Sequence, residues 1–256
     1  MIRLKSKREI EAIRGAARIL RQAFNELRLA VGPGITTLEL DQLAEAAIRG
    51  KGGLPAFKGY RNFPRTLCVS INEEVVHGIP SNRKLKEGDL VSLDLGVKFE
   101  GYYADAARSW AVGSGSPEVM KLIRVARESF LSGVRAVEKP GKRIGDISRA
   151  VQETIESNGF GVVREYVGHG IGQEIHEEPQ VPNFGRGGQG PKIEPGLVLA
   201  IEPMVTAGHY AVEVLEDGWT VVTKDGSLAS HYEDTVAFTE QGPENLTGPE
   251  GTRPEA

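Results

Sequence analysis

Apolar side chains recur every three or four residues in four stretches of the chain, and this spacing predicts amphipathic helices. The four stretches are residues 7–30, 37–48, 117–137 and 146–157. Capping residues support the first two starts, because Ser6 with Glu9 and Thr36 with Glu39 form capping boxes. Ser116, which a proline follows, marks the third start in the same way.

Between these helices lie short runs rich in valine, leucine and aromatic residues, which are typical of β-strands. They are residues 67–71, 90–95, 102–112, 162–167, 197–202, 219–222 and 231–239. Residues 96–101 are expected to form the turn between two of these strands. Helices followed by antiparallel strands predict an α+β fold.

Two strand segments repeat each other at a fixed distance along the chain. KLKEGDLVSLD, which ends at Asp94, matches KIEPGLVLAIE, which ends at Glu202, at an offset of 108 residues. The helices that precede them, each introduced by Pro-Gly, repeat at an offset of 107 residues. Such self-similarity indicates an internal duplication, with copies at roughly residues 30–112 and 137–239. We expect one domain over residues 1–240 and a disordered tail over residues 241–256, which are almost devoid of apolar side chains.

Acidic residues occupy corresponding places in the two copies. Asp94 and Asp105 lie on neighbouring strands of the first copy, and Glu202 and Glu233 lie on strands of the second. If the copies pack about a pseudo-twofold axis, the four carboxylates meet at its centre. Four buried like charges repel strongly, so the pattern predicts divalent cations that neutralise them. A single acidic residue on a strand is usually just exposed to solvent, but matching positions in both copies favour the metal site.

Three of the five histidines, namely His77, His169 and His176, lie in short segments that contain glycine or proline near expected strand ends. Loops on a rigid scaffold often carry binding and catalytic residues, so these histidines are candidates for the site. One imidazole among carboxylates favours Mn, Fe(II), Co or Zn over Mg and Ca. His209 and His231 have no comparable context, and we assign them no role.

Composition excludes several classes of protein. The chain of 256 residues has a net charge of −4, which argues against nucleic acid as its main partner. It has no apolar run of the roughly 18 residues that a membrane helix needs, and no apolar segment follows its basic start. We therefore expect neither membrane association nor secretion. Cys68 is the only cysteine, so we expect no intrachain disulfide and a reducing, cytoplasmic location.

The carboxylates and His169 resemble the ligand set of the superfamily of methionine aminopeptidase, aminopeptidase P and prolidase, whose fold is called pita-bread. Within it, the chain resembles the bacterial type I methionine aminopeptidases. The matching motifs are SINE at 70–73, VHGIP at 76–80, DLG at 94–96, GHGIG at 168–172, HEEPQVP at 176–182 and IEPM at 201–204.

The resemblance implies two pseudo-symmetric half-repeats of helices packed on antiparallel strands and a site for two divalent metal ions. Their identity (Co, Mn, Fe(II) or Zn) is not specified by the sequence. Asp94 would chelate one ion, and His169 with Glu202 would hold the other. Asp105 and Glu233 would bridge the two.

The resemblance also implies an activity, which is removal of the N-terminal methionine from nascent proteins and peptides with a preference for a small second residue. His77 and His176 would contact the substrate, and Glu202 would also serve as an acid–base group. An apolar slot for the methionine side chain would be lined by Tyr60, Phe63, Cys68 and Trp219.

Two alternatives remain open at this stage. A proline-specific aminopeptidase or a prolidase would share the metal site. A non-catalytic pita-bread protein would bind a partner, although such proteins typically lose ligands and all five positions are filled here. The chain also departs from the type I pattern at Phe57, Arg61 and Ile175, which bears on subsite preference.

The first 28 residues are basic, with eight Lys or Arg residues against three Glu. A solvated helix face is the simplest explanation of this charge. A weak contact with ribosomal RNA, near the exit of nascent chains, is the alternative.

Overall fold

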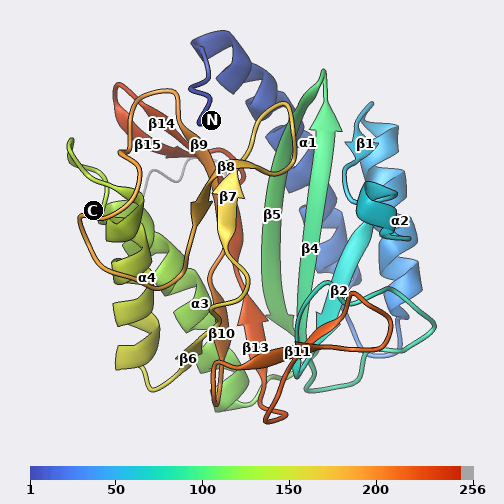
Figure 1. Ribbon diagram of the computed structural model, residues 1–256. Helices are drawn as coiled ribbons and strands as arrows, with labels where there is room; N and C mark the ends of the chain where they lie inside the picture. Colours follow the sequence, from blue (N-terminus) through green and yellow to red (C-terminus); the bar gives the residue numbers. More distant parts are fainter. Residues whose placement is uncertain (249–256) are drawn as a thin grey trace.

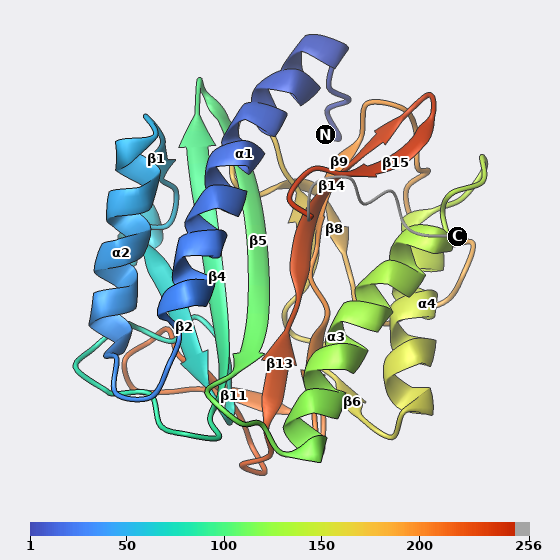
Figure 2. The ribbon, with the colours of Figure 1, turned by 180° about the vertical axis from the view of Figure 1, so that it is seen from behind.

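The structure is a computed structural model that describes residues 1–248. Two pairs of helices lie against one face of a large sheet, as Figure 2 shows from the helical side. The helices are α1 (Lys7–Ala30), α2 (Thr37–Gly50), α3 (Pro117–Arg135) and α4 (Ile144–Ser157), with a short 3-10 turn at Tyr60–Asn62. Both predicted capping boxes and the Ser116 cap are present, so the helix starts predicted from them are confirmed.

Within residues 1–248, the large sheet has nine strands, and its central path runs β1-β4-β5-β14-β9-β7-β8 (Figure 1). β2 pairs with β4, and β15 pairs with β14. These strands are β1 (Leu54–Pro55), β2 (Leu67–Ile71), β4 (Leu90–Phe99), β5 (Tyr102–Ala111), β7 (Gly168–Gly170), β8 (Glu177–Val181), β9 (Val198–Ile201), β14 (Glu233–Thr239) and β15 (Gly242–Asn245).

The described part of the chain also forms two three-stranded sheets, in the orders β13-β10-β6 and β11-β12-β3. Their strands are β3 (Glu74–Val76), β6 (Gly161–Val162), β10 (Met204–Thr206), β11 (Val212–Val214), β12 (Val221–Thr223) and β13 (Ala229–His231). All strand pairs are antiparallel, and the α+β prediction is confirmed. Among the described helices, none is both long and apolar enough to cross a membrane.

The hydrophobic core is divided between the two helix pairs. Leu20 and Ile48 of the first pair pack with Leu93 of β4, and Phe130 and Ile147 of the second pair belong to a separate cluster that includes Val236 of β14. Each helix pair therefore has its own cluster against the sheet, although the first cluster also includes Val198 of β9 and the second Leu90 of β4. The ladder between β5 and β14 joins the two halves of the sheet.

The hairpin of β4 and β5 is longer than predicted, and the expectation of a turn over residues 96–101 is wrong. The ladder continues to the pair Phe99 and Tyr102, so the turn consists of Glu100 and Gly101 alone. Both have positive φ, 49° and 86°, which is the backbone of a tight two-residue hairpin turn. Gly96 lies inside β4. The Phe57 ring occupies the space that a side chain at position 96 would need, because a Cβ there would lie 2.7 Å from the ring.

Strands of the second half are shorter than predicted. Of the expected strand at 162–167, only Val162 is paired, and the strand expected at 219–222 is shifted to Val221–Thr223. The run expected at 231–239 breaks at Tyr232 into β13 and β14, which belong to different sheets.

The expectation that disorder begins at residue 241 is also wrong. β15 pairs with β14, and Leu246 and Thr247 are buried. Hydrogen bonds hold this segment: Asn245 Nδ2 and Thr247 Oγ1 both donate to the Asp234 carboxylate, at 2.8 and 2.6 Å. The amino-acid composition of this segment does not reveal that it is ordered, because hydrogen bonds between polar groups hold it in place. Residues 249–256 lie outside the described residues.

Candidate metal centre

Neighbouring strands of the large sheet each bring one candidate ligand to the site. In the order β4, β5, β14, β9 and β7, the residues are Asp94, Asp105, Glu233, Glu202 (directly after β9) and His169. Residues far apart in the sequence therefore meet because their strands pair side by side.

The register places these side chains on one face. Ala107 of β5 is opposite Asp94 on one side and opposite Glu233 on the other. Asp105 lies two residues before Ala107, and because side chains alternate along a strand it shares that face. His169 is likewise opposite Ala200, two residues before Glu202.

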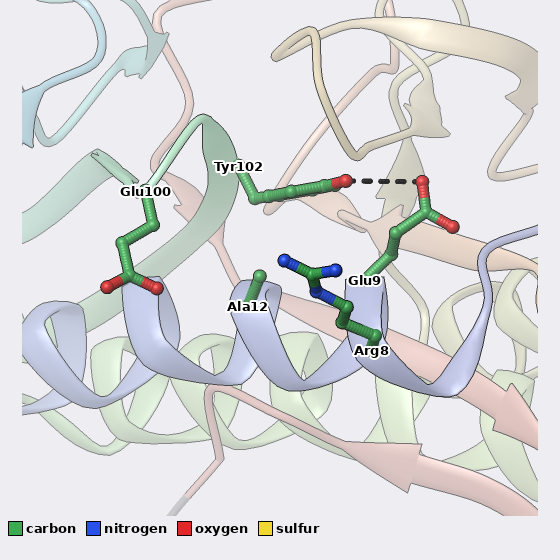
Figure 3. Close-up of a pocket in the computed structure, with 5 residues that line it drawn as sticks. All are labelled: Arg8, Glu9, Ala12, Glu100 and Tyr102. Atoms are coloured by element: carbon green, nitrogen blue, oxygen red, sulfur yellow. Dashed lines mark hydrogen bonds between the residues drawn. The ribbon is translucent and has the colours of Figure 1, made fainter.

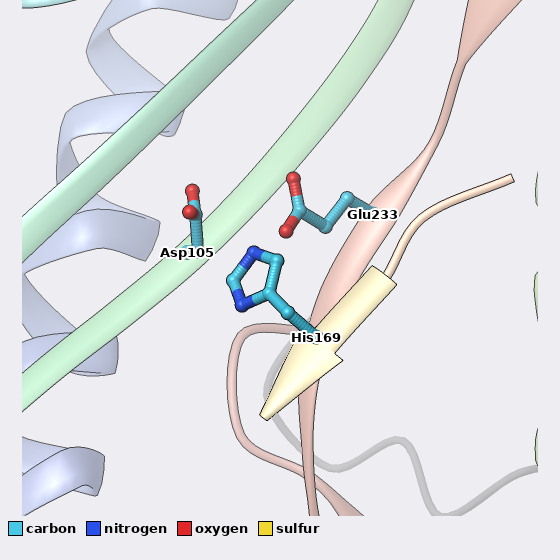
Figure 4. Close-up of side chains that lie close together, drawn as sticks. All are labelled: Asp105, His169 and Glu233. Atoms are coloured by element: carbon cyan, nitrogen blue, oxygen red, sulfur yellow. The ribbon is translucent and has the colours of Figure 1, made fainter. Parts of the chain in front are cut away.

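The predicted ligands are close together and mostly buried. One ligand atom each from Asp105, His169 and Glu233 lies within 4.8 Å of the others, and Figure 4 shows these three side chains pointing toward one another. His169 Nε2 lies 3.5 Å from Glu202 Oε1. Asp105, His169 and Glu233 are buried, and Asp94 and Glu202 are half-buried.

The donor set fits a metal ion. Among residues 1–248, the buried oxygens without a hydrogen-bond donor include Asp94 Oδ1, Asp105 Oδ1 and Glu233 Oε1. An unpartnered buried carboxylate oxygen is costly, and three in one cluster call for a cation.

Electrostatics leads to the same conclusion. Burial raises the pKa values of Asp94, Glu202 and Glu233 well above the usual carboxyl range, and repulsion from neighbouring carboxylates raises them further. Burial also raises the pKa of Asp105, to about 7. It lowers the pKa of His169 to about 4, so this imidazole is neutral and can coordinate a metal. The metal-free cluster thus holds protons that a divalent cation would displace.

The other two candidate histidines lie beside this cluster. The rings of His176 and His169 are 4.3 Å apart, and His176 Nδ1 lies 2.9 Å from the Tyr60 hydroxyl. His77 has a positive φ of 61°, and its ring makes edge contacts with Trp219 and Tyr166. Burial lowers the pKa of His77 to about 4. Desolvation, helped by the nearby charges of His169 and Arg61, lowers the pKa of His176, although part of its surface is exposed.

All four residues predicted to line an apolar slot belong to one cluster. Phe63 and Cys68 are buried in it, and Tyr60 and Trp219 pack against it. Cys68 is paired with Asp94 in the ladder of β2 and β4, which places the cluster next to the carboxylates. Two of the departures from the type I pattern, Phe57 and Ile175, are members of the same cluster, and the guanidinium of Arg61 lies 5.4 Å from the centre of the Tyr60 ring.

Sequence reasoning missed one residue of the site, His231. Its ring is buried, and its Nε2, which has no hydrogen-bond partner among the described residues, lies 3.9 Å from Glu233 Oε2 and 4.0 Å from Glu202 Oε2. Burial lowers the pKa of His231 to about 3. Alternation along the predicted strand 231–239 would have indicated His231, because it precedes Glu233 by two residues and its side chain would lie on the same face.

Comparison with known proteins agrees with this geometry. Residues 11–240 match metallopeptidase family M24. The chain belongs to this family. It is 53% identical to a methionine aminopeptidase of Clostridium perfringens over 96% of this chain and 99% of the relative.

Solved structures of the family share the fold. The crystal structure of methionine aminopeptidase from Thermotoga maritima is 46% identical, with a TM-score of 0.94 over 97% of this chain and all of that one. Prolidase from Pyrococcus furiosus is 26% identical, with a TM-score of 0.78 over 96% of this chain and 66% of that one. The predicted pita-bread fold is thereby confirmed.

Proposed function

We propose that this M24 metallopeptidase removes the N-terminal methionine from nascent proteins and peptides, with a preference for a small second residue. One observation supports the proposal most: a complete set of five candidate ligands lies beside an apolar cluster and two further histidines. Identity of 53% over nearly the full length of a protein named methionine aminopeptidase supports it independently.

The residues present fit two divalent ions, of Co, Mn, Fe(II) or Zn. Asp94 would hold one and His169 with Glu202 the other, while Asp105 and Glu233 would bridge them. When bound, such ions lower the pKa of a coordinated water, which makes hydroxide available near neutral pH.

The chain's own side chains would then move protons and hold the substrate. A neutral His176 that accepts a hydrogen bond from Tyr60 at Nδ1 carries its proton on Nε2, and it can donate that proton to the oxyanion formed at the scissile carbonyl. The leaving amine needs a proton, which Glu202 or His77 would relay as a general acid–base group. His77 would contact the peptide beyond the scissile bond, where a small second residue leaves room for it.

The apolar cluster would hold the methionine side chain. Tyr60, Phe63, Cys68 and Trp219 offer rings and a thiol, and aromatic rings contact a thioether favourably. Burying such a side chain contributes about 1.5–3 kcal/mol, whereas a lysine side chain would find no partner in this slot. We expect an exopeptidase, because the free N-terminal amine of the substrate can bind a metal and an acylated amine cannot.

The decisive experiment is a peptide screen with enzyme reconstituted separately with Mn, Fe(II), Co and Zn. Met-Ala-Ser should be cleaved rapidly, its norvaline and leucine analogues about 10- to 200-fold more slowly in kcat/KM, and Lys-Ala-Ser and formyl-Met-Ala-Ser not at all. Faster cleavage of Ala-Pro or Ala-Pro-Ala would replace this proposal with a proline-specific peptidase. Absence of bound metal by elemental analysis, together with inactivity, would favour a non-catalytic binding protein.

We also propose that the enzyme works in the cytoplasm, with a weak ribosome contact through the basic face of α1. Lys7 and Arg8 are exposed. Arg14 instead pairs with Glu244, and Arg21 donates to the Leu246 carbonyl, so part of the basic charge is used within the fold. Binding through phosphates falls steeply with salt. Co-sedimentation with ribosomes at low salt should therefore weaken when Lys7 and Arg8 are both replaced by Gln. No co-sedimentation, or no effect of the replacement, would disprove the contact.

A further inference from the structure

Lys5 is a buried lysine outside the metal centre. Its side chain is 4% exposed, and its Nζ lies 2.7 Å from Glu177 Oε2, a carboxylate that is 9% exposed. Lysine is rarely buried without a partner, and this one joins the N-terminal segment to the residue that directly follows His176.

Glu177 also closes the loop that carries His176. Its Oε1 accepts hydrogen bonds from the backbone N–H groups of Gln173 and Glu174, at 2.9 and 3.2 Å. The other end of the loop is anchored to β5, because the Tyr103 N–H donates to the Gly172 carbonyl at 2.8 Å. One carboxylate thus binds both the loop backbone and the Lys5 ammonium.

The position of Lys5 is itself fixed. Its N–H donates to the Gly196 carbonyl at 2.6 Å, and its Nζ donates to the Arg3 carbonyl at 3.0 Å. The packing is tight around its stem: a Cβ added to Gly172 would lie 2.5 Å from Lys5 Cε. The lysine therefore fits between the loop and the start of β9 with little room to move.

A second contact joins the same two segments. The Tyr102 hydroxyl donates to Glu9 of α1 at 3.2 Å, and it accepts from Gln173 Nε2 at 3.2 Å. Figure 3 shows the Tyr102–Glu9 bond at the edge of a cavity of about 540 Å³ that Arg8, Ala12 and Glu100 also line. The hydrogen bonds of Tyr102 are partly exposed, whereas the Lys5–Glu177 ion pair is buried.

We infer that Lys5 is a positioning residue for His176: its buried ion pair with Glu177 holds the loop of residues 172–177, and this loop sets the imidazole against Tyr60 and His169. The inference rests on the proposed function in so far as His176 acts on the substrate. The N-terminal segment thereby affects catalysis through the contact between Lys5 and Glu177, although it lies outside the ligand-bearing strands.

A double-mutant cycle tests this role. Lys5→Met should lower kcat/KM for Met-Ala-Ser by about 10- to 100-fold, mainly through kcat, because a small displacement of a catalytic group has costs of this size. Metal content should stay at the wild-type value. In a His176→Ala background, Lys5→Met should cause little further loss, because the group it positions is already absent. Equal losses in both backgrounds, or loss of metal, would overturn the inference.

The matched control is Lys51→Met, which removes a lysine that pairs with Glu26 at 3.0 Å on the other end of α1. It should leave kcat/KM unchanged. If Lys5→Met does not fold, Glu177→Gln serves instead, since it removes the charge and keeps an oxygen for the loop N–H groups. Wild-type activity in Glu177→Gln would also overturn the inference.

Hydrogen exchange separates this inference from the proposed function. In Lys5→Met, but not in Lys51→Met, the amides of Gln173 and Glu174 should lose protection, whatever substrate the enzyme takes. Unchanged protection would contradict the inference even if Met-Ala-Ser is cleaved. Inactivity of the wild type toward Met-Ala-Ser with lost protection in the variant would instead refute the proposed function alone.

Discussion

The two halves of the molecule supply their carboxylates in different ways. In the first half, Asp94 and Asp105 lie on a single unbroken hairpin, β4 and β5, with ten paired positions. In the second, β10 to β13 lie between the strands that lead to Glu202 and Glu233, and two of these belong to a different sheet from the other two. Corresponding bridges, Thr36 with Lys84 and Arg143 with Lys192, nevertheless occur in both.

The imidazoles are also unevenly divided between the two halves. His169, His176 and His231 all belong to the second half, on its short strands and loops, while the first half contributes His77 alone. His169 and His231 lie on the short strands β7 and β13, and His176 lies between β7 and β8. The short strands and loops of the second half therefore carry the ring nitrogens to the same carboxylates. The site is therefore chemically asymmetric although its carboxylates are paired, and this asymmetry distinguishes the two proposed metal positions.

The largest expected effect comes from breaking either carboxylate pair. Asp94→Asn in the first half and Glu233→Gln in the second should each lose metal and reduce kcat by more than roughly 10³-fold, because groups that act as a unit fail together. Elemental analysis and turnover of Met-Ala-Ser measure both. Wild-type metal content and turnover in either variant would show that its half does not contribute to one common centre.

A somewhat smaller effect is expected from the histidines beside the metal ligands, one from each half. His77→Ala and His176→Ala should retain metal and lose about 10²–10³ in kcat, if each donates one hydrogen bond that matters in the transition state. Steady-state kinetics with parallel metal analysis would test this. Metal loss in His176→Ala would make it a ligand and would enlarge the contribution of the second half.

The pH dependence of the metal-free fold tests the coupling between the halves. Burial raises the pKa values of Asp94, Glu202 and Glu233, so the fold keeps protons that the unfolded chain releases above about pH 4. At these three groups the unfolded state binds fewer protons, so their contribution to the free energy of unfolding falls as pH rises from about 4 through the raised values.

Denaturant unfolding in the presence of a chelator, at pH 5 and pH 8, measures this effect. The carboxyls lower the free energy of unfolding between these pH values, while His77, His169, His176 and His231 raise it, because their imidazoles bind protons below about pH 6.5 only in the unfolded chain. The histidines contribute alike to the wild type and to Asp94→Asn, so the difference between the two proteins measures the carboxyls. From pH 5 to pH 8, the free energy of unfolding should change less favourably in the wild type than in Asp94→Asn, because one of the repelling charges is gone in the variant. Equal changes in the two proteins would show that the two carboxylate pairs do not interact.

Much of this arrangement follows from local sequence patterns, and the exceptions have physical causes. Helix starts were predictable because capping is decided within four residues, as at Ser6 and Thr36. The ligands were found because the duplication marks Asp94 and Glu202 independently of any fold. The break at Tyr232, by contrast, depends on which sheet each strand joins, and no local pattern records that choice. His231 has a different explanation, because no motif in the sequence around it points to a role.

The ordered C-terminal segment shows a second limit of sequence patterns and links the two halves. Arg108 of β5 donates to Asp234 of β14 at 2.5 Å, and Thr247 donates to the same carboxylate. Thr247 Oγ1 also accepts from the Thr235 N–H at 2.9 Å. Hydrogen bonds to groups from distant parts of the chain leave no hydrophobic periodicity, so the segment was expected to be disordered.

The smallest predicted effect concerns this link. Thr247→Val keeps the shape of the side chain but leaves the buried Thr235 N–H without an acceptor, which should cost about 1–3 kcal/mol. Asp234 Oδ1 loses one donor but keeps its hydrogen bond from Arg108. Thermal unfolding of the metal-loaded protein measures the loss, and Thr239→Val, at the less buried end of β14, is the matched control with a smaller expected change. The hydrogen bonds of Thr247 go to Asp234 and Thr235 and not to any proposed metal ligand, so metal content should stay at the wild-type value. Loss of metal in Thr247→Val would mean that the joint between the halves, and not each half alone, sets the positions of the bridging carboxylates.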